Sequence, residues 1–499
     1  MKPAIRLFNL FRDARLATLL FSSLLVSCGG GAAIAIISGI GGTGISFGTV
    51  LAFGSIIVNG SELDSSTVTV TLDDNPPVNV SIDSNNRGGL KEGMVVKISG
   101  DFSGNSGTAA TIVYKDNLEG EVCSKLSSGG ITTLRVLGQR VILDATTIVD
   151  DGSPTPATID SIIPGDIVEV SGLPDNLGNI HASFVENKTA SGAATVTEVK
   201  GPISLLTPTT FNINNLQVNY MPQVIDNSIP NQLLVDGLFV EVKSTTVSCN
   251  FPDSLTDTLT ATVVELESEG AGAISDDDHA EVEGLITVAL NPPGVLGVFK
   301  IGNQEVVITT STRYTPLDFV INNIELGTKV EAEGTSTGGV FTADKISFRE
   351  SVRLESKVAT VSSSSFTLEG LGFPTNITIM TNSATDFNGI TIIPGISLRV
   401  RGIEGPNDTV LATSIESGSG GGSPPAILQG VVDSIGGLSI TVLGTPVDTS
   451  TITVFKDVKD KPISSTAFLG LVQKGTIVKF KSASAGPTIT WDEAELEDD

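Results

Sequence analysis

The sequence IIPGDIVEVSG, residues 162–172, is the phrase that decides the fold of this chain. It consists of an apolar pair, a glycine at Gly165 and a run in which apolar and polar residues alternate. Alternation with a period of two is typical of a β-strand that buries one face. The glycine predicts a sharp turn into that strand, at a position that needs a positive φ or has no room for a side chain.

The phrase recurs along the chain. A strand pair precedes each copy, and a further strand with a small residue near its start follows it. Thr, Val and Ile dominate these runs, and Gly, Asn, Asp and Pro separate them, so we expect short antiparallel strands. The spacing of the copies, between 68 and 90 residues, indicates one repeated unit, and its marker glycines are Gly93, Gly165, Gly237, Gly327, Gly395 and Gly475.

A unit of about 70 residues with roughly five short strands buries little core as an open sheet, so we predict closure into a small OB-like barrel. Closure also hides edge strands. A small β-sandwich is the alternative. We therefore predict an all-β array with repeats at 48–116, 117–191, 192–270, 279–350, 351–416 and 427–499, an acidic linker at 271–278 and a Gly/Ser linker at 417–426.

The first residues have the order of an export signal. Basic residues precede Arg15, an apolar run extends from Leu16 to Val26, and small residues follow. This order predicts a signal peptide at 1–27. Leu25-Val26-Ser27-Cys28 resembles a bacterial lipobox, which implies cleavage before Cys28 and acylation of that residue, followed by a Gly-rich tether at 28–47. An uncleaved membrane helix is the alternative.

The residues around the first unit resemble those of a known family. The segment GIGGTGIS (residues 39–46), the strand pair GTVLAFGSIIVNG (48–60) and the phrase LKEGMVVKISG (90–100) are similar to the opening of bacterial lipoproteins built from tandem copies of domain of unknown function 5666. The resemblance covers most of the mature chain and is strongest in the first unit. It implies no catalytic residues.

Composition excludes several classes of protein. The 499 residues contain 29 Lys plus Arg against 56 Asp plus Glu, a net charge of −27, which argues against a nucleic-acid partner. Hydrophobic residues make up 40%, too many for a disordered acidic chain. Two histidines and three cysteines leave little material for a histidine-based metal site or a disulfide-rich scaffold. We interpret the acidic excess as the solubilising outer surface of an exported protein.

Two glycine motifs suggest catalysis or nucleotide binding by their letters alone. Residues 39–44 form a G-x-G-x-x-G, with Asp64 twenty residues beyond it, and residues 44–48 form a G-x-S-x-G. Both motifs function at a strand-to-helix turn, whereas a hairpin pattern follows here. His181 and His279 lie in distant units. We therefore predict no catalytic residues.

The acidic pairs, the aromatic residues and the cysteines are the candidates for metal, carbohydrate and disulfide sites. Asp276–Asp278, Asp73–Asp74 and Asp150–Asp151 lack the spacing of a calcium loop, so we predict no metal and no cofactor. Aromatic residues form no stacking platform, because Tyr114, Tyr220, Tyr314 and Trp491 are scattered among the units. In an oxidising compartment Cys123 and Cys249 are candidates for a disulfide; two separate thiols are the alternative.

These observations predict a lipid-anchored protein of the cell envelope. Gly29, where an inner-membrane retention signal has Asp, favours the outer membrane, with the array facing the periplasm or the cell surface. We expect non-enzymatic binding or surface display, with the acyl chains in the membrane and a protein or glycan of unknown identity as partner. The alternative is a periplasmic scaffold or accessory subunit of an envelope complex.

Overall fold

The computed structural model describes most of the chain beyond residue 40. The predicted signal peptide, Cys28, Gly475, Asp276 and Asp277 lie outside the described residues. The described residues are 41–497 except 54, 60, 84, 104–105, 129–130, 145, 154–156, 194, 250–256, 269, 273, 276–277, 316–319, 349–351, 373–375, 382–384, 386, 406–407, 419–424, 459–460 and 475.

Within these residues, no helix combines the length and the apolar character needed to cross a membrane.

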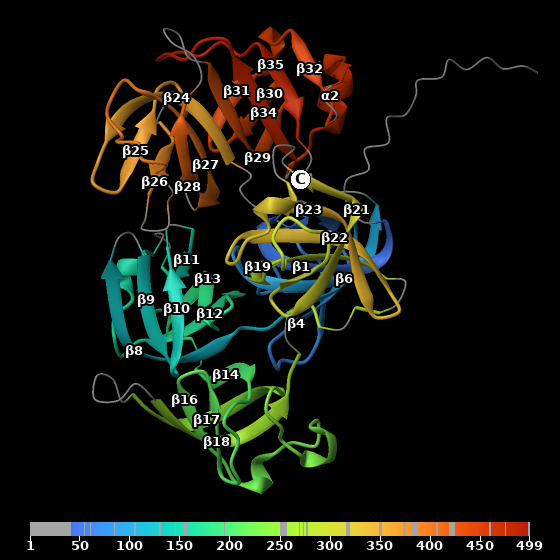
Figure 1. Ribbon diagram of the computed structural model, residues 1–499, viewed down its shortest axis with the longest axis vertical. Helices are drawn as coiled ribbons and strands as arrows, with labels where there is room; N and C mark the ends of the chain where they lie inside the picture. The colour runs from blue at the N-terminus through green and yellow to red at the C-terminus, as the bar shows by residue number, and fades with distance from the viewer. Residues whose placement is uncertain are drawn as a thin grey trace, which may run out of the picture. The chain divides into compact units, whose positions relative to one another are not determined.

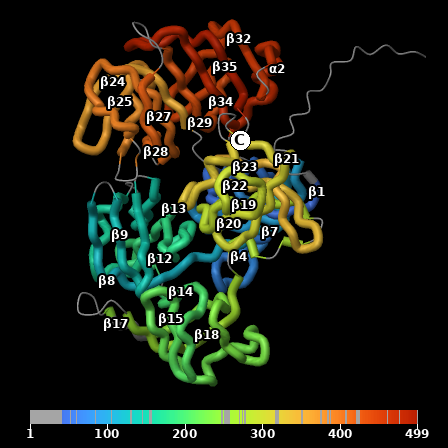
Figure 2. Tube along the Cα trace, viewed as in Figure 1, coloured from blue at the N-terminus to red at the C-terminus, as the bar shows by residue number. Residues whose placement is uncertain are grey.

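The described chain is almost entirely β-structure, as predicted, and its strands form three sheets (Figures 1 and 2). The first sheet contains β1 (Gly41–Phe53), β2 (Ile56–Val58), β3 (Ser61–Asp64), β4 (Val68–Leu72), β5 (Val78–Val80), β6 (Val95–Ser103), β7 (Ser106–Tyr114), β19 (His279–Val288), β20 (Val298–Ile301), β21 (Gln304–Thr315), β22 (Lys329–Thr337) and β23 (Val340–Phe348).

The second sheet follows the first seven strands in the chain. It contains β8 (Leu118–Ser128), β9 (Ile131–Val136), β10 (Gln139–Leu143), β11 (Ile148–Asp150), β12 (Ile167–Pro174), β13 (Ile180–Asn187), β14 (Thr197–Pro202), β15 (Thr210–Ile213), β16 (Leu216–Asn219), β17 (Phe239–Ser248) and β18 (Asp257–Leu266). The short helix α1 (Lys188–Ser191) lies between β13 and β14.

The third sheet takes up the rest of the chain, and the helix α2 (Ser465–Leu471) lies between its strands β33 and β34. It contains β24 (Val352–Val361), β25 (Ser365–Leu368), β26 (Thr378–Met380), β27 (Ser397–Gly405), β28 (Thr409–Ser417), β29 (Ala426–Gly436), β30 (Ser439–Val442), β31 (Thr445–Asp448), β32 (Val454–Lys456), β33 (Pro462–Ile463), β34 (Ile477–Ser482) and β35 (Glu493–Leu496).

Closed rings of five strands occur in all three sheets, two of them in the first sheet. In the first unit β1 pairs antiparallel with both β2 and β6, while β3 and β7 pair in parallel, so the order β1-β2-β3-β7-β6 returns to β1. The order recurs as β8-β9-β10-β13-β12, as β19-β20-β21-β23-β22 and as β24-β25-β26-β28-β27. A five-stranded ring of this kind, antiparallel except for one parallel pair, is an OB-like barrel, which confirms the predicted fold class.

The units are not six separate domains, and this part of the prediction is corrected. The first strands of two units pair with each other, so that one sheet runs through both: β1 with β19 in parallel, β8 with β14 and β24 with β29 antiparallel. In Figure 1 blue β1 and yellow β19 lie side by side although they are far apart in the sequence. The reason is that a strand edge left free outside a ring satisfies its backbone groups by continuing the ladder.

The hydrophobic cores follow this pairing. In the second and the third sheet, one continuous core extends through both units. In the first sheet the two units keep separate cores, and Phe184 of β13 packs into the core of the first unit. Three modules of two units each therefore replace the predicted array of six independent barrels.

The predicted Gly-rich tether at 28–47 does not extend to residue 47, because β1 already begins at Gly41. Gly41–Phe47 is part of β1 and pairs with β6 on one side, while residues 44–47 pair with β19 on the other. Glycines in a strand are compatible with close approach of neighbouring backbones, so a glycine-rich segment is not by itself a flexible one.

Candidate functional site

A dense group of ionisable side chains lies where the first and second sheets meet. We call Asp73, Asp74, Asp116, Glu198, Lys200, Glu241 and Lys243 the buried charge cluster; Asp74, whose side chain is 50% exposed, lies at its edge. Asp73 and Asp74 lie in the turn after β4, and Asp116 lies between β7 and β8. Glu198 and Lys200 extend from β14, and Glu241 and Lys243 from β17, two adjacent strands of the second sheet.

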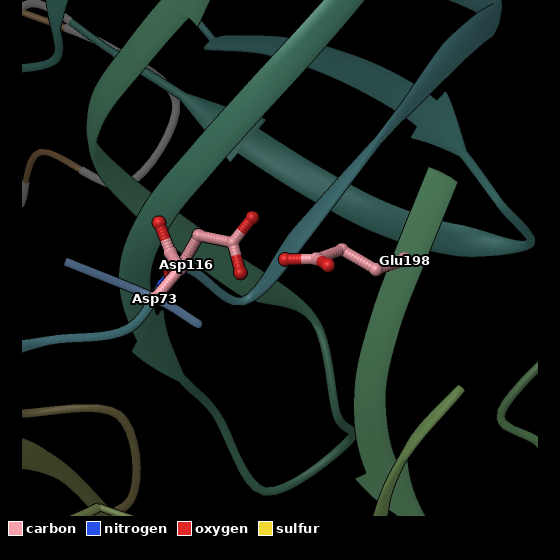
Figure 3. A group of neighbouring side chains, drawn as sticks. All are labelled: Asp73, Asp116 and Glu198. Carbon is pink, nitrogen blue, oxygen red and sulfur yellow. The ribbon is translucent and has the colours of Figure 1, made fainter. Parts of the chain in front are cut away.

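The carboxylates of this cluster lie close together. Figure 3 shows Asp73 and Asp116 beside each other, with Glu198 pointing toward them. One oxygen from each of these three lies within 4.8 Å of the others, and the same holds for Asp74, Glu198 and Glu241. Carboxylate oxygens at such spacing are suitable ligands for a hard cation such as Ca²⁺.

Two lysines occupy the space among these carboxylates. The ammonium of Lys200 contacts Asp116 and lies 3.4 Å from Glu198 Oε1 and 3.7 Å from Glu241 Oε1. Lys243 contacts Asp74 and lies 3.5 Å from the same Glu241 oxygen. A cation bound here would have to displace an ammonium group that already pairs with its ligands. The arrangement fits an internal ion-pair network better than a metal centre.

Burial controls the protonation of this cluster. It raises the pKa of Asp116 to about 7 and that of Asp73 to about 6, although the positive charge of Lys200 opposes both shifts. Burial likewise raises the pKa of Glu241 to about 7. For Lys200, burial favours the neutral amine, but Asp116, Glu241 and Glu198 together raise its pKa well above the ordinary value. The lysine therefore stays charged while the carboxyls share protons near neutral pH.

Buried acidic residues also occur elsewhere in the first and third sheets. They correct the expectation that the acidic residues form a solvated outer surface. Glu281, Glu331 and Glu355 are at most 2% exposed, although their strand positions alternate with core residues. The sequence indicates a solvated acidic surface at such positions. Glu281, for example, accepts a 3.1 Å hydrogen bond from Ser61 Oγ of the paired first unit. The neighbours of the three glutamates include ion pairs between Lys345 and Glu333 (3.0 Å), Arg399 and Glu355 (3.2 Å) and Lys479 and Glu495 (2.8 Å).

A second acidic group lies in the third sheet. One oxygen each of Glu404, Asp408 and Asp433 lies within 4.8 Å of the others. Burial, followed by the charges of Asp433 and Asp408, raises the pKa of Glu404 to about 8. Asp433 Oδ2 accepts a hydrogen bond of 2.9 Å from the backbone N–H of Gly444. Among the described residues, no Lys or Arg forms an ion pair with these three carboxylates, in contrast to the buried charge cluster.

A cavity of about 1150 Å³ opens beside the buried charge cluster. Its wall includes Asp116 and Lys200 of that cluster, together with residues of β1, β6, β12 and β19. Pockets that bind small molecules commonly have volumes of about 300–1,000 Å³, with apolar walls and a few polar groups. The cavity and the cluster together form the candidate site. From the sequence, only Asp73 and Asp74 of this site were candidates, and they were not predicted to bind a metal. The cavity and the other cluster residues were missed, because they come from units that are distant in the chain.

The predicted marker glycines take similar backbone conformations. Gly93, Gly165, Gly237, Gly327 and Gly395 have φ between +81° and +97°, a region that side-chain-bearing residues rarely adopt. Each lies in the turn before the fourth strand of its ring or of the corresponding unit.

Cys123 of β8 and Cys249 after β17 form a disulfide, with their Cα atoms 5.4 Å apart. This bond connects the two units of the second sheet.

The residues of the two glycine motifs are not arranged for catalysis. Ser46 is fully buried in β1, where its Oγ accepts a 3.0 Å hydrogen bond from Asn59 Nδ2. His181 Nε2 lies 3.3 Å from Asp175, and His279 Nδ1 lies 3.3 Å from Thr335 Oγ1. The serine therefore has a partner other than either histidine. Strand β1, rather than a turn into a helix, contains residues 41–48, the part of the two motifs that the structure describes.

Comparisons with known proteins identify a repeated domain. Four segments match the family described as Domain of unknown function (DUF5666), at residues 119–186, 283–347, 355–416 and 429–481. These are the second, fourth, fifth and sixth units, so the first unit, whose residues resemble that family most in the sequence, is outside the matched segments. No curated protein matches the chain. A solved structure titled "drosophila Unr CSD456" is 16% identical, covers 46% of this chain and 98% of its own, and has a TM-score of 0.12.

Proposed function

We propose, from the premise that this chain belongs to the family built from tandem DUF5666 domains, that it is a lipid-anchored, non-enzymatic binding array of the cell envelope. The anchor is proposed from the sequence: the basic start, the apolar run and the lipobox-like residues that end at Cys28 resemble those of an exported lipoprotein. Three acyl chains on that residue would hold the protein stably in a membrane.

The cavity beside the buried charge cluster is the observation that supports a binding role. It is large enough for a small molecule and combines apolar with charged walls. The neighbouring carboxylates are paired with Lys200 and Lys243, so they are suited to holding the modules together rather than to exchanging protons with a substrate. The proposed binding role therefore does not require these carboxylates to act as acids or bases.

The anchor is tested by the substitution Cys28→Ser in cells labelled with radioactive palmitate. We expect the wild-type protein to carry label and to sediment with membranes, and the variant to lose the label and to be released in the soluble extract. Ser22→Ala, outside the lipobox-like residues, is the control and should leave both properties unchanged. A variant that remains in the membrane would contradict the anchor.

The binding role is tested by native mass spectrometry of the protein purified from its own envelope. A bound compound that is recovered chemically unchanged after long incubation supports binding without catalysis. Conversion of that compound to a product would overturn the non-enzymatic part of the proposal.

A further inference from the structure

We propose that the cavity between the first and second sheets binds a small anionic amphiphile, of the class of a long-chain carboxylate, with its acid group on the ammonium of Lys97. This inference rests on the binding role proposed above. It assigns a ligand class and a recognition residue to a site that the family's name leaves open.

The ion pairs along the cavity wall distinguish Lys97 from the other lysines that line the cavity. Lys115 contacts Glu267, Lys200 contacts Asp116, and Lys300 lies 3.1 Å from Glu305, so three of the lysines in the wall have a carboxylate partner. Lys97 extends into the same wall from β6 and forms no ion pair with any described residue. Among the described residues of the cavity wall, Lys97 is therefore the one lysine whose ammonium group has no carboxylate partner.

The surroundings of Lys97 leave space for an acid group. The residue is half-buried, and this burial lowers the pKa of its amine. A Cβ placed on Gly272 would lie 3.5 Å from Lys97 Nζ, so the segment that faces the ammonium has no side chain there. An incoming carboxylate can replace the water that this ammonium has lost, and charge-assisted hydrogen bonds of this type are the strong ones.

The rest of the wall supplies an apolar surface. Phe47 of β1, Val95 of β6, Leu173 of β12 and Leu285 of β19 pack together where three units meet, and all four line the cavity. A ligand with an acid group at one end and a hydrocarbon body could contact both Lys97 and these side chains. The volume of about 1150 Å³ is sufficient for such a molecule.

The experiment uses two fluorescent probes with similar aromatic bodies: 8-anilinonaphthalene-1-sulfonate, which is an anion, and N-phenyl-1-naphthylamine, which is neutral. The protein is the chain with Cys28→Ser, so that its own acyl chains cannot occupy the cavity. We expect one saturable site for the anionic probe, which dodecanoate displaces and dodecanol displaces poorly. Lys97→Gln should weaken the anionic probe about 10-fold or more and leave the neutral probe nearly unchanged.

Two further variants make the result decisive. Lys97→Arg keeps the charge and should retain most of the affinity, whereas Lys461→Gln, an exposed lysine of the third sheet, should change nothing. The inference is overturned if the anionic probe does not saturate, if Lys97→Gln binds it like the wild type, or if Lys97→Arg loses affinity as fully as Lys97→Gln. Such a failure would leave the anchor and a binding role for other ligands intact, because neither depends on Lys97.

Discussion

Lys200 lies at the junction between the first and second sheets. Its side chain is 6% exposed and stands among Asp116, Glu198 and Glu241. We expect Lys200→Met to lower the free energy of unfolding by about 3–5 kcal/mol, because it leaves buried carboxylates without their counter-ion. Urea denaturation followed by circular dichroism measures the change.

The double variant Lys200→Met with Asp116→Asn separates lost charge pairing from lost packing. It should be more stable than the sum of the single changes predicts, because removing the carboxylate removes the unpaired charge. Exposed Lys461→Met is the control and should shift stability by less than about 0.5 kcal/mol. Additive single effects would show that Lys200 acts only through packing.

Glu404 makes the stability of the third sheet depend on pH. Burial raises its pKa from 4.5 to about 8, so the folded chain holds this proton over a range in which the unfolded chain releases it. Stability is therefore fully present below about pH 4.5 and falls as pH rises toward 8, by up to about 1.4 kcal/mol per pH unit.

Glu404→Gln should remove this loss. We expect the variant to exceed the wild type in urea midpoint at pH 8.5 and to approach it near pH 5. Asp433, whose pKa is also raised by burial, would maintain part of the slope. Glu325→Gln, at an exposed position in the turn before β22, is the matched control. Equal pH profiles for Glu404→Gln and wild type would contradict the buried protonated carboxyl.

At the scale of the residue, sequence predicts the core better than the charges. Apolar positions such as Val168 and Val170 alternate as expected and are fully buried. Glu169 between them has the pattern of a solvated residue but is 5% exposed, because Tyr114 donates a 2.7 Å hydrogen bond to it and Lys188 lies 2.5 Å from it. Periodicity within one strand does not indicate whether another unit covers its outer face.

The fourth strand of a ring contains a second recurrent glycine, which has a different function from the marker glycine. Gly334 lies at a β-bulge of β22, and a Cβ there would approach the carbonyl of Thr342 to less than 3.0 Å. Gly100, Gly172 and Gly402 occupy corresponding bulges and meet the last strand in the same way. The bulge bends the strand so that the ring can close.

Gly334→Ala and Gly327→Ala compare these two functions within one unit. We expect the first to cost at least about 3 kcal/mol of unfolding free energy, because backbone must move to admit the methyl group. Gly327 has φ of +81° and open space around it, so its substitution should cost only about 1–2 kcal/mol. Urea midpoints of both variants decide the order, and a larger loss for Gly327→Ala would contradict the assignment.

At the scale of the element, the repeated phrase carries enough information to predict the turn, the strand and the ring. It does not distinguish the functions of the two glycines, because a missing side chain explains both. The bulge becomes apparent only when the register of β22 against β23 is known.

At the scale of the whole molecule, the pairing of units could not be predicted. Backbone hydrogen bonds between first strands, such as those of β1 with β19, need no particular side chain. A repeated sequence therefore indicates that several similar rings exist without indicating which of them join. In the structure the first unit pairs with the fourth, the second with the third and the fifth with the sixth. This choice depends on which strand edges meet in the fold.

The pairing of β24 with β29 predicts how the third sheet responds to cleavage. The ladder joins Arg353 to Gln429, and one core extends through both units. A specific protease site inserted in 419–424 should therefore give two fragments that stay together in native gel filtration and separate in guanidinium. A site inserted in 349–351 is the control, because among the described residues no strand pairs the first sheet with the third. The fragments from cleavage in 349–351 should separate more readily than those from cleavage in 419–424. If the fragments from 419–424 separate more readily instead, the two units of the third sheet are independent barrels.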